Sequence, residues 1–105
     1  MCNFQELAMN ESGYVVRCSH CSHYQIYFSG IILSLSHPSF LQWISYLEGL
    51  ARSASEEGCP STRTVIATPD GGVHLVVSAH ELFHLKALLQ EAENEVTALH
   101  LMELF

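Results

Sequence analysis

The fold is decided by residues 24–44, which read YQIYF-SG-IILSL-SHPSFLQWI. Tyr24–Phe28 is rich in aromatic and β-branched residues, and the Ser-Gly pair that follows it favours a tight turn. After the turn, Ile31, Leu33 and Leu35 recur with a period of two and therefore share one face of a strand. This stretch predicts a β-hairpin that leads into a helix.

The helix is predicted over residues 38–52. Pro38 suits the first turn of a helix, and Ser36 or His37 would be the N-cap before it. Apolar side chains then recur at the helical spacing of three and four residues, at Phe40, Trp43, Ile44, Leu47 and Leu50.

The same order of elements follows a polar linker, residues 53–61. Strands are predicted at 64–68 and 73–77 around a Pro-Asp-Gly-Gly turn, and Ser78 is predicted to cap a second helix, with Glu81 completing a capping box. Placing Ser36 on Ser78, an offset of 42, aligns six apolar positions, namely Ile31 with Val73, Leu33 with Leu75, Leu35 with Val77, Phe40 with Leu82, Trp43 with Leu85 and Leu47 with Leu89.

We therefore expect an α+β fold with a mostly antiparallel sheet of about five strands, two helices on one face and a hairpin-helix pseudo-repeat. The 105 residues suffice for one domain, residues 1–105, in which segments 1–52 and 62–105 share one core. An apolar content of 49% with only 14% charged residues is typical of a folded chain.

Charge and hydropathy narrow the classes of partner. The net charge of −7 opposes binding to nucleic acid and to anionic membranes. No run approaches the ~18 apolar residues of a membrane span, and the N-terminus lacks a signal-peptide pattern. We expect a cytoplasmic protein with neither nucleic acid nor membrane as partner.

Seven His and four Cys outnumber the four Lys and Arg residues. Cys18 and Cys21 lie between two predicted strands, and in a reducing cytosol such a pair indicates a metal or redox site before a disulfide. We call residues 18–23 the knuckle. A tetrahedral zinc or iron site needs two further ligands, which we predict to be Cys2 and either His20 or His23.

Two other interpretations of the knuckle stay open. The cysteines could be half-buried thiols beside surface histidines, or Cys18 and Cys21 could form a redox dithiol. The redox interpretation is less favoured because reactive pairs of the thioredoxin type lie at a helix N-terminus, whereas this pair lies between strands.

His80-Glu81-Leu82-Phe83-His84 matches the His-Glu-x-x-His string of zinc proteases. The helical stripe places His80 near solvent and His84 on its flank, and Glu81 already has a capping role. Gln90 stands where a third histidine ligand of metzincins would be. We expect surface or capping histidines here, and a minimal metallohydrolase remains the alternative function.

The apolar pattern of the second helix predicts a surface that binds a partner. Its stripe at 82, 85, 89, 92, 96 and 99 carries the helix beyond the predicted sheet, and a second stripe comprises Phe83, Ala87, Leu101 and Phe105. This pattern predicts a homodimer formed through the C-terminal helix. Alternatively, the chain breaks near Asn94 and its last residues fold back onto the core.

Several of these segments together resemble a small bacterial family known as a domain of unknown function. They are Met1-Cys2-Asn3-Phe4, the Cys18-x-x-Cys21 turn, and the Tyr24–Phe28 strand leading to Ile31-x-Leu33-x-Leu35. The resemblance implies an N-terminal thiol that acts with the Cys pair, and it implies glycine where Ser22 and Ser29 stand. The resemblance implies no activity for this chain. We therefore expect a non-enzymatic, metal-binding domain, with structural zinc and a role in protein interaction.

Overall fold

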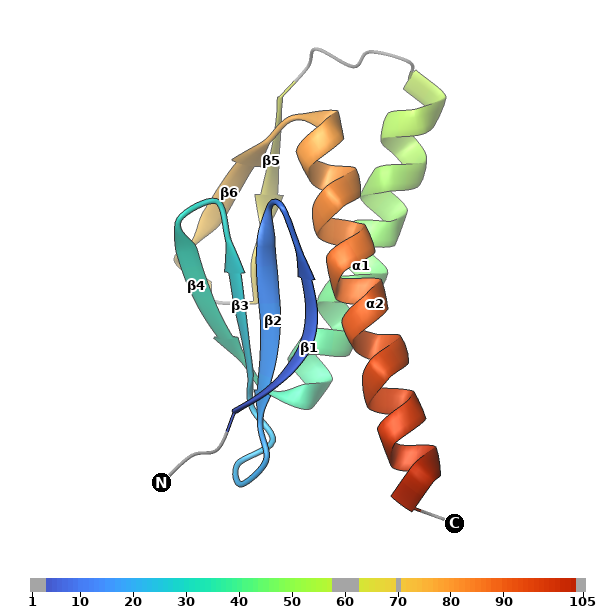
Figure 1. Ribbon diagram of the computed structural model, residues 1–105. Coiled ribbons are helices and arrows are strands. Elements are labelled where there is room, and N and C mark those ends of the chain that lie inside the picture. The colour runs from blue at the N-terminus through green and yellow to red at the C-terminus, as the bar shows by residue number, and fades with distance from the viewer. Residues whose placement is uncertain (1–3, 58–62, 70, 104–105) are drawn as a thin grey trace.

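A computed structural model describes residues 4–57, 63–69 and 71–103. Within these residues a four-stranded antiparallel sheet is accompanied by a two-stranded sheet and two long helices, and both helices stand on the same side of the strands (Figure 1). The elements are, in chain order, β1 Phe4–Asn10, β2 Gly13–Cys18, β3 Tyr24–Phe28, β4 Ile31–Leu35, α1 His37–Glu57, β5 Thr64–Ala67, β6 His74–Val77 and α2 Ala79–Glu103.

The four-stranded sheet is a meander in which each strand pairs with the next in sequence. One row of paired residues crosses all four strands on the inner face, and every member is buried, namely Ala8, Val15, Ile26 and Leu33. Because side chains alternate along a strand, the neighbouring rows face outward. The inner row forms the floor on which the helices pack.

The turn between β3 and β4 has two residues, both with positive φ, 53° at Ser29 and 84° at Gly30. Two positive φ values are typical of the type I′ turn, whose twist matches that of the strands it joins. The predicted hairpin is therefore confirmed. Ser29 adopts the conformation that glycine tolerates better than any other residue.

Both helices begin at the predicted serine caps. The Ser36 hydroxyl accepts a hydrogen bond from the Ser39 N–H at 3.4 Å, and the Ser78 hydroxyl accepts one from the Glu81 N–H at 3.1 Å. Most of the side chains that the helices bury belong to the predicted stripes, namely Phe40, Trp43, Ile44 and Leu47 from α1 and Leu82, Leu85, Leu89 and Ala92 from α2. Ala51 and Leu88 are buried in addition, whereas the predicted Leu50, Val96 and Leu99 are only partly buried.

The two sheets are joined through α1. The Trp43 indole N–H donates to the Ala67 carbonyl at 2.8 Å, and the Ala67 N–H donates to the Tyr46 hydroxyl at 3.1 Å. Both backbone groups of this β5 residue are thus bonded by side chains of a helix from the first half of the chain. The halves share a single buried cluster rather than two separate cores.

The α+β class, the antiparallel pairing and the placement of both helices on one side are confirmed, while the expected sheet of about five strands is in fact a pair of sheets. The additional strand is β1, which runs beside β2. The register shifts at Leu7, so that Leu7 and Ala8 are both buried in succession. This irregularity removes the alternation by which a strand is recognised in sequence.

The helices are longer than predicted. α1 continues to Glu57, through residues 53–57 that we assigned to the linker, and this segment contains no glycine or proline that would end the helix. α2 runs unbroken to Glu103, so the alternative of a break near Asn94 is wrong. No helix within the described residues is long and apolar enough to cross a membrane.

Candidate functional site

The knuckle turn is closed by two backbone hydrogen bonds. The Cys18 N–H donates to the His23 carbonyl at 2.9 Å, and the Ser22 N–H donates to the Cys18 carbonyl at 3.0 Å. Ser22 has a φ of 59°, in the left-handed region where glycine is the residue of choice. The position at which the resemblance implies glycine is therefore one where the backbone conformation favours it.

The ligand candidates differ in their exposure. Cys18 is buried at the end of β2, whereas Cys21, His20 and His23 are exposed. The His23 Nδ1–H donates to the Cys21 carbonyl at 3.1 Å, which leaves the lone pair of the neutral ring on Nε2. Hydrogen bonds of this kind orient metal-binding histidines in other proteins.

The described residues alone do not complete a metal centre. No three His, Cys, Asp or Glu side chains among them gather in a group that could hold an ion. Cys2 and Cys59 lie outside the described residues. The strand register bears on Cys2, however, because Phe4 pairs with Cys18 across β1 and β2.

The His-Glu-x-x-His string has structural partners. The Glu81 carboxylate accepts from the Ser78 N–H at 3.0 Å, which confirms the capping box, and this backbone hydrogen bond lowers the pKa of Glu81. The Ser12 hydroxyl and the His84 Nδ1 are hydrogen-bonded at 3.1 Å, and the Asn10 side chain donates to the His84 carbonyl at 3.3 Å.

His80 is exposed and its ring centroid lies 4.2 Å from that of His84. Two imidazoles are thus adjacent on α2, but the carboxylate that would be the general base of a hydrolase is held by the helix N-terminus. In the described residues, the hydrogen bonds of His84 connect α2 with the β1–β2 turn.

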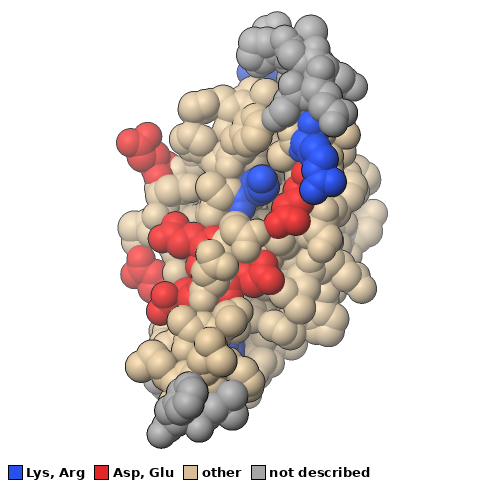
Figure 2. All heavy atoms as spheres, turned by 90° about the vertical axis from the view of Figure 1, so that its right-hand side faces the viewer, with Lys and Arg blue, Asp and Glu red and all other residues tan. Residues whose placement is uncertain are grey.

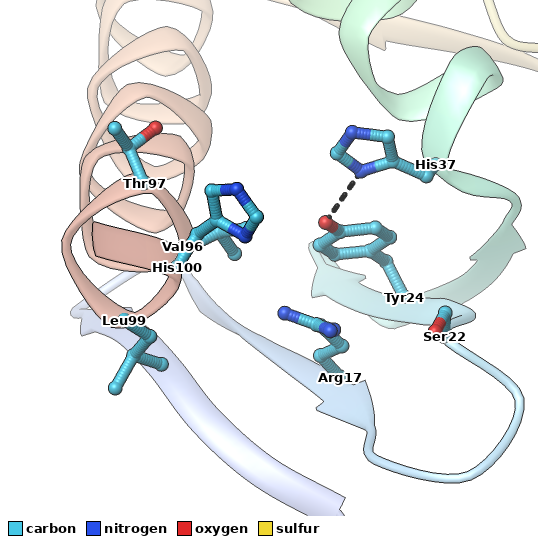
Figure 3. Close-up of a pocket in the computed structure, with 8 residues that line it drawn as sticks. All are labelled: Arg17, Ser22, Tyr24, His37, Val96, Thr97, Leu99 and His100. Atoms are coloured by element: carbon cyan, nitrogen blue, oxygen red, sulfur yellow. Dashed lines mark hydrogen bonds between the residues drawn. The ribbon is translucent and has the colours of Figure 1, made fainter. Parts of the chain in front are cut away.

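A cavity of about 490 Å³ lies under the last turns of α2, on the inner side of the sheet (Figure 3). Arg17 of β2 and Tyr24 of β3, a directly paired couple in the sheet, form one side of it. His37 at the start of α1 and His100 near the end of α2 project toward the same space. We call it the Arg17 cavity.

Tyr24 connects the cavity with the core. It is 1% exposed, its ring stacks on Phe40 with centroids 4.1 Å apart, and its hydroxyl is hydrogen-bonded to the His37 Nδ1 at 2.8 Å. Burial raises the pKa of the Tyr24 phenol, so the hydroxyl stays protonated, and the tautomer of His37 sets the direction of the hydrogen bond between them. Sequence reasoning missed this cavity because its residues are distant in the chain and each one is unremarkable locally.

A second feature that sequence reasoning missed is an apolar row on the outer face of the sheet. Met9, Tyr14, Tyr27 and Ile32 are paired in succession across β1 to β4. The two tyrosine rings stack with centroids 5.2 Å apart, while Met9 and Ile32 at the ends are more than half exposed. We call these four residues the outer row.

The surface of α2 combines charged and apolar patches. Acidic side chains gather across the middle of the face shown in Figure 2, and the exposed Glu91 and Glu95 lie on α2. Of the predicted dimer stripe, Phe83, Ala87 and Leu101 are exposed, whereas Phe105 lies outside the described residues.

Comparison with known protein families identifies the family of this chain. The model of one family, Family of unknown function (DUF6686), matches residues 1–104, almost the whole chain. The protein belongs to this family. The comparisons with curated proteins and with solved structures found no match. The resemblance to a domain of unknown function is thereby confirmed, and no activity is transferred from it.

Proposed function

We propose that the protein is a non-enzymatic domain that binds structural zinc at the knuckle and engages other protein in the cytoplasm. The ligands are Cys2, Cys18 and Cys21, with His23 as the fourth. The observation that carries this proposal is the register of β1 and β2, in which Phe4 stands opposite Cys18.

Covalent geometry limits how far Cys2 can lie from the knuckle. Only Asn3 stands between Cys2 and Phe4 in the sequence, so the Cα atoms of Cys2 and Phe4 are at most ~7 Å apart. Since Phe4 is paired with Cys18, the N-terminal cysteine is within reach of the turn that holds Cys18 and Cys21. Three thiolates and one imidazole are a common tetrahedral set for zinc, with Zn–S distances of about 2.3 Å.

His23 is favoured over His20 as the fourth ligand. Its Nδ1–H is engaged by the Cys21 carbonyl, so its Nε2 has the free lone pair that a metal ion needs. No bond of this kind is present for His20, which is also exposed in the described part of the turn. His20 remains the substitute if His23 is removed.

Metal content of purified full-length variants tests the zinc site. We expect zinc in a one-to-one ratio with the chain, lost in Cys2→Ser, Cys18→Ser and Cys21→Ser and reduced in His23→Gln. Cys59→Ser is the matched control because it removes a cysteine from the linker, and His74→Gln removes an exposed histidine of β6. Full zinc in Cys2→Ser would exclude the proposed ligand set.

Cobalt substitution provides a second measurement that does not depend on yield. Co²⁺ in a tetrahedral thiolate site gives intense visible and near-ultraviolet bands whose strength follows the number of Co–S bonds. Each Cys→Ser variant of the set should weaken these bands, whereas Cys59→Ser should leave them unchanged. A spectrum typical of octahedral oxygen ligands would contradict the proposal.

For the protein partner we propose a second copy of this chain, bound through the C-terminal part of α2. Leu101 and Met102, adjacent at the end of the helix, expose 50% and 72% of their surface, and contiguous exposed apolar side chains of this kind mark a partner surface. A chain that ends at His100 keeps the walls of the Arg17 cavity and removes only the apolar end of the helix.

Light scattering on this truncated chain should give half the mass of the full chain. A parallel variant, Met9→Lys combined with Ile32→Lys, disrupts the outer row and should leave the mass unchanged. If the truncation has no effect and the double variant halves the mass, the outer row is the interface and the assignment to α2 is wrong.

A further inference from the structure

The Arg17 cavity has the size of a ligand site. Its volume of about 490 Å³ is in the range of about 300–1,000 Å³ found for small-molecule pockets. Strands form one side, the first residue of α1 a second side and the last turns of α2 a third (Figure 3). Ser22 of the knuckle closes one edge. These walls come from four separate parts of the chain.

Basic groups are concentrated in this cavity. The protein has four Lys and Arg residues and a net charge of −7, yet Arg17, His37 and His100 all face the same space. No Asp or Glu of the described residues lines it. Glu93 acts electrostatically on the Tyr24 hydroxyl from farther along α2 without reaching the cavity wall. One fixed positive charge, Arg17, with two imidazoles beside it and no carboxylate among the described lining residues offers a site for an anion.

The hydrogen bond between Tyr24 and His37 fixes the orientation of the imidazole beside the cavity. In the neutral tautomer whose Nδ1 accepts from the Tyr24 hydroxyl, the His37 ring carries its proton on Nε2. That N–H is then available to a ligand, as are the N–H groups of Arg17, whose fork geometry matches a carboxylate or phosphate. The positive end of the α1 dipole adds to this potential, since His37 is the first residue of the helix.

The opposite side of the cavity is apolar. Val96 and Leu99 of α2 line it, and both are only partly buried although they pack against the core. In Figure 3 Val96 lies beside His100 on the side of the basic groups, whereas Leu99 points down from α2 at the edge of the cavity. A ligand with a charged head and an apolar body would cover this surface and contact Arg17 at once, whereas a bare inorganic ion would leave it exposed to water.

From this arrangement we propose that the Arg17 cavity binds a small organic anion. The carboxylate or phosphate head contacts the Arg17 guanidinium and the imidazoles of His37 and His100, and the apolar body packs on Val96 and Leu99. None of the proposed zinc ligands is among the described residues that line the cavity, although Ser22, between Cys21 and His23, does line it.

Calorimetric titration of the full chain with four probes tests the chemistry. Benzoate and phenyl phosphate carry an anionic head and an apolar body, benzyl alcohol lacks the charge, and inorganic phosphate lacks the body. We expect at least one of the two organic anions to bind with a Kd near or below about 1 mM, and the other two probes to bind at least about tenfold more weakly.

Variants assign the binding to the cavity. Arg17→Gln should weaken the bound organic anion by about 10- to 100-fold, as expected for a lost charged hydrogen bond. Arg52→Gln removes an exposed arginine of α1 and should have no effect, and His23→Gln, which changes only the knuckle, should likewise leave the affinity unaltered. Amide NMR shifts on binding should be largest at Ser22 and Thr97, which line the cavity.

Three results would overturn the proposal. The first is that neither organic anion binds with a Kd below about 10 mM. The second is that Arg17→Gln and Arg52→Gln bind equally well, which would indicate general attraction to positive charge. The third is that His23→Gln abolishes binding, since the anion would then sit on the knuckle.

Arg17→Lys keeps the charge without the fork, and an affinity between those of wild type and Arg17→Gln would show that a folding defect does not explain the loss.

Discussion

The hairpin β3–β4 turns through two residues and the hairpin β5–β6 through six, yet each leads into a serine cap and a helix that buries the same pattern of side chains. Five of the six aligned pairs are buried in both halves, and Ile31 with Val73 is the exception. The halves differ in what is added to them. The first is extended by β1 and β2, and this extension contributes the knuckle and one side of the Arg17 cavity.

The difference teaches where chemistry resides in this fold. Positions that match between the halves are core positions, and they keep the two helices in place. Arg17, Cys18 and Cys21 belong to the added strands and their turn, and His37 aligns with Ala79, a residue without a polar side chain. The residues that could bind a ligand or a metal are thus those in which the halves are unlike.

The largest effect should come from equivalent leucines of the two helices. Leu47→Ala and Leu89→Ala each leave a cavity at a side chain with no exposed surface, and each should lower the free energy of unfolding by about 2–5 kcal/mol. Urea titration followed by circular dichroism measures this loss, with the half-exposed Leu101→Ala as control. Unfolding of one half alone would contradict the shared core.

Removing the serine caps should lower the stability less than removing the leucines, and by different amounts in the two halves. Ser78→Ala removes the 3.1 Å hydrogen bond from the Glu81 N–H and should cost about 1 kcal/mol, while the Glu81 carboxylate keeps the backbone N–H of residue 78. Ser36→Ala removes the longer 3.4 Å bond from the Ser39 N–H and the bond to the Ser39 hydroxyl, and should cost about half as much. Thermal unfolding of the two variants gives the comparison. An equal loss would mean that the longer cap at Ser36 contributes as much as the shorter one at Ser78.

The two hairpin turns should respond differently to glycine. Ser29→Gly relieves a positive φ and should stabilise the protein by about 0.5–1 kcal/mol, even though glycine makes the unfolded chain more flexible. The control is Ser34→Gly in the middle of β4, which should destabilise by a similar amount. A loss of stability in Ser29→Gly would show that the serine side chain has a role of its own.

The smallest effect concerns the pH dependence of the cap on α2. Because the Ser78 N–H lowers the pKa of Glu81, the folded state holds this proton less tightly than the unfolded state. The stabilisation is present above the ordinary carboxyl pKa and is lost as pH falls through the lowered one. Between about pH 5 and pH 3 the wild type should lose more stability than Glu81→Gln, by a fraction of 1 kcal/mol. Parallel losses would exclude the linkage.

Local signals made much of this fold predictable. The Ser29-Gly30 turn, the caps at Ser36 and Ser78 and the apolar stripes of both helices depend on residues close in sequence, and each is found as expected. β1 was not predicted as a strand because its pairing with β2 depends on a bulge at Leu7 and its composition is mixed. The division into two sheets depends on packing, which periodicity does not encode.

The two candidate sites also differ in whether the sequence alone could reveal them. The knuckle could be recognised because Cys18, Cys21 and His23 lie within six residues of chain. The Arg17 cavity brings together Arg17, His37 and His100, which no spacing rule connects, so only the three-dimensional structure assembles it. The zinc ligand set itself stays a prediction until metal content is measured.

The hydrogen bond from Trp43 to the Ala67 carbonyl has a practical consequence for following the protein in solution. Trp43 is the single tryptophan of the chain, it is 3% exposed, and its indole N–H bridges the first half to β5 of the second. Its fluorescence therefore reports on one defined junction. Any ligand, metal or variant that loosens the contact between the halves should shift the emission to longer wavelength, without a label being attached.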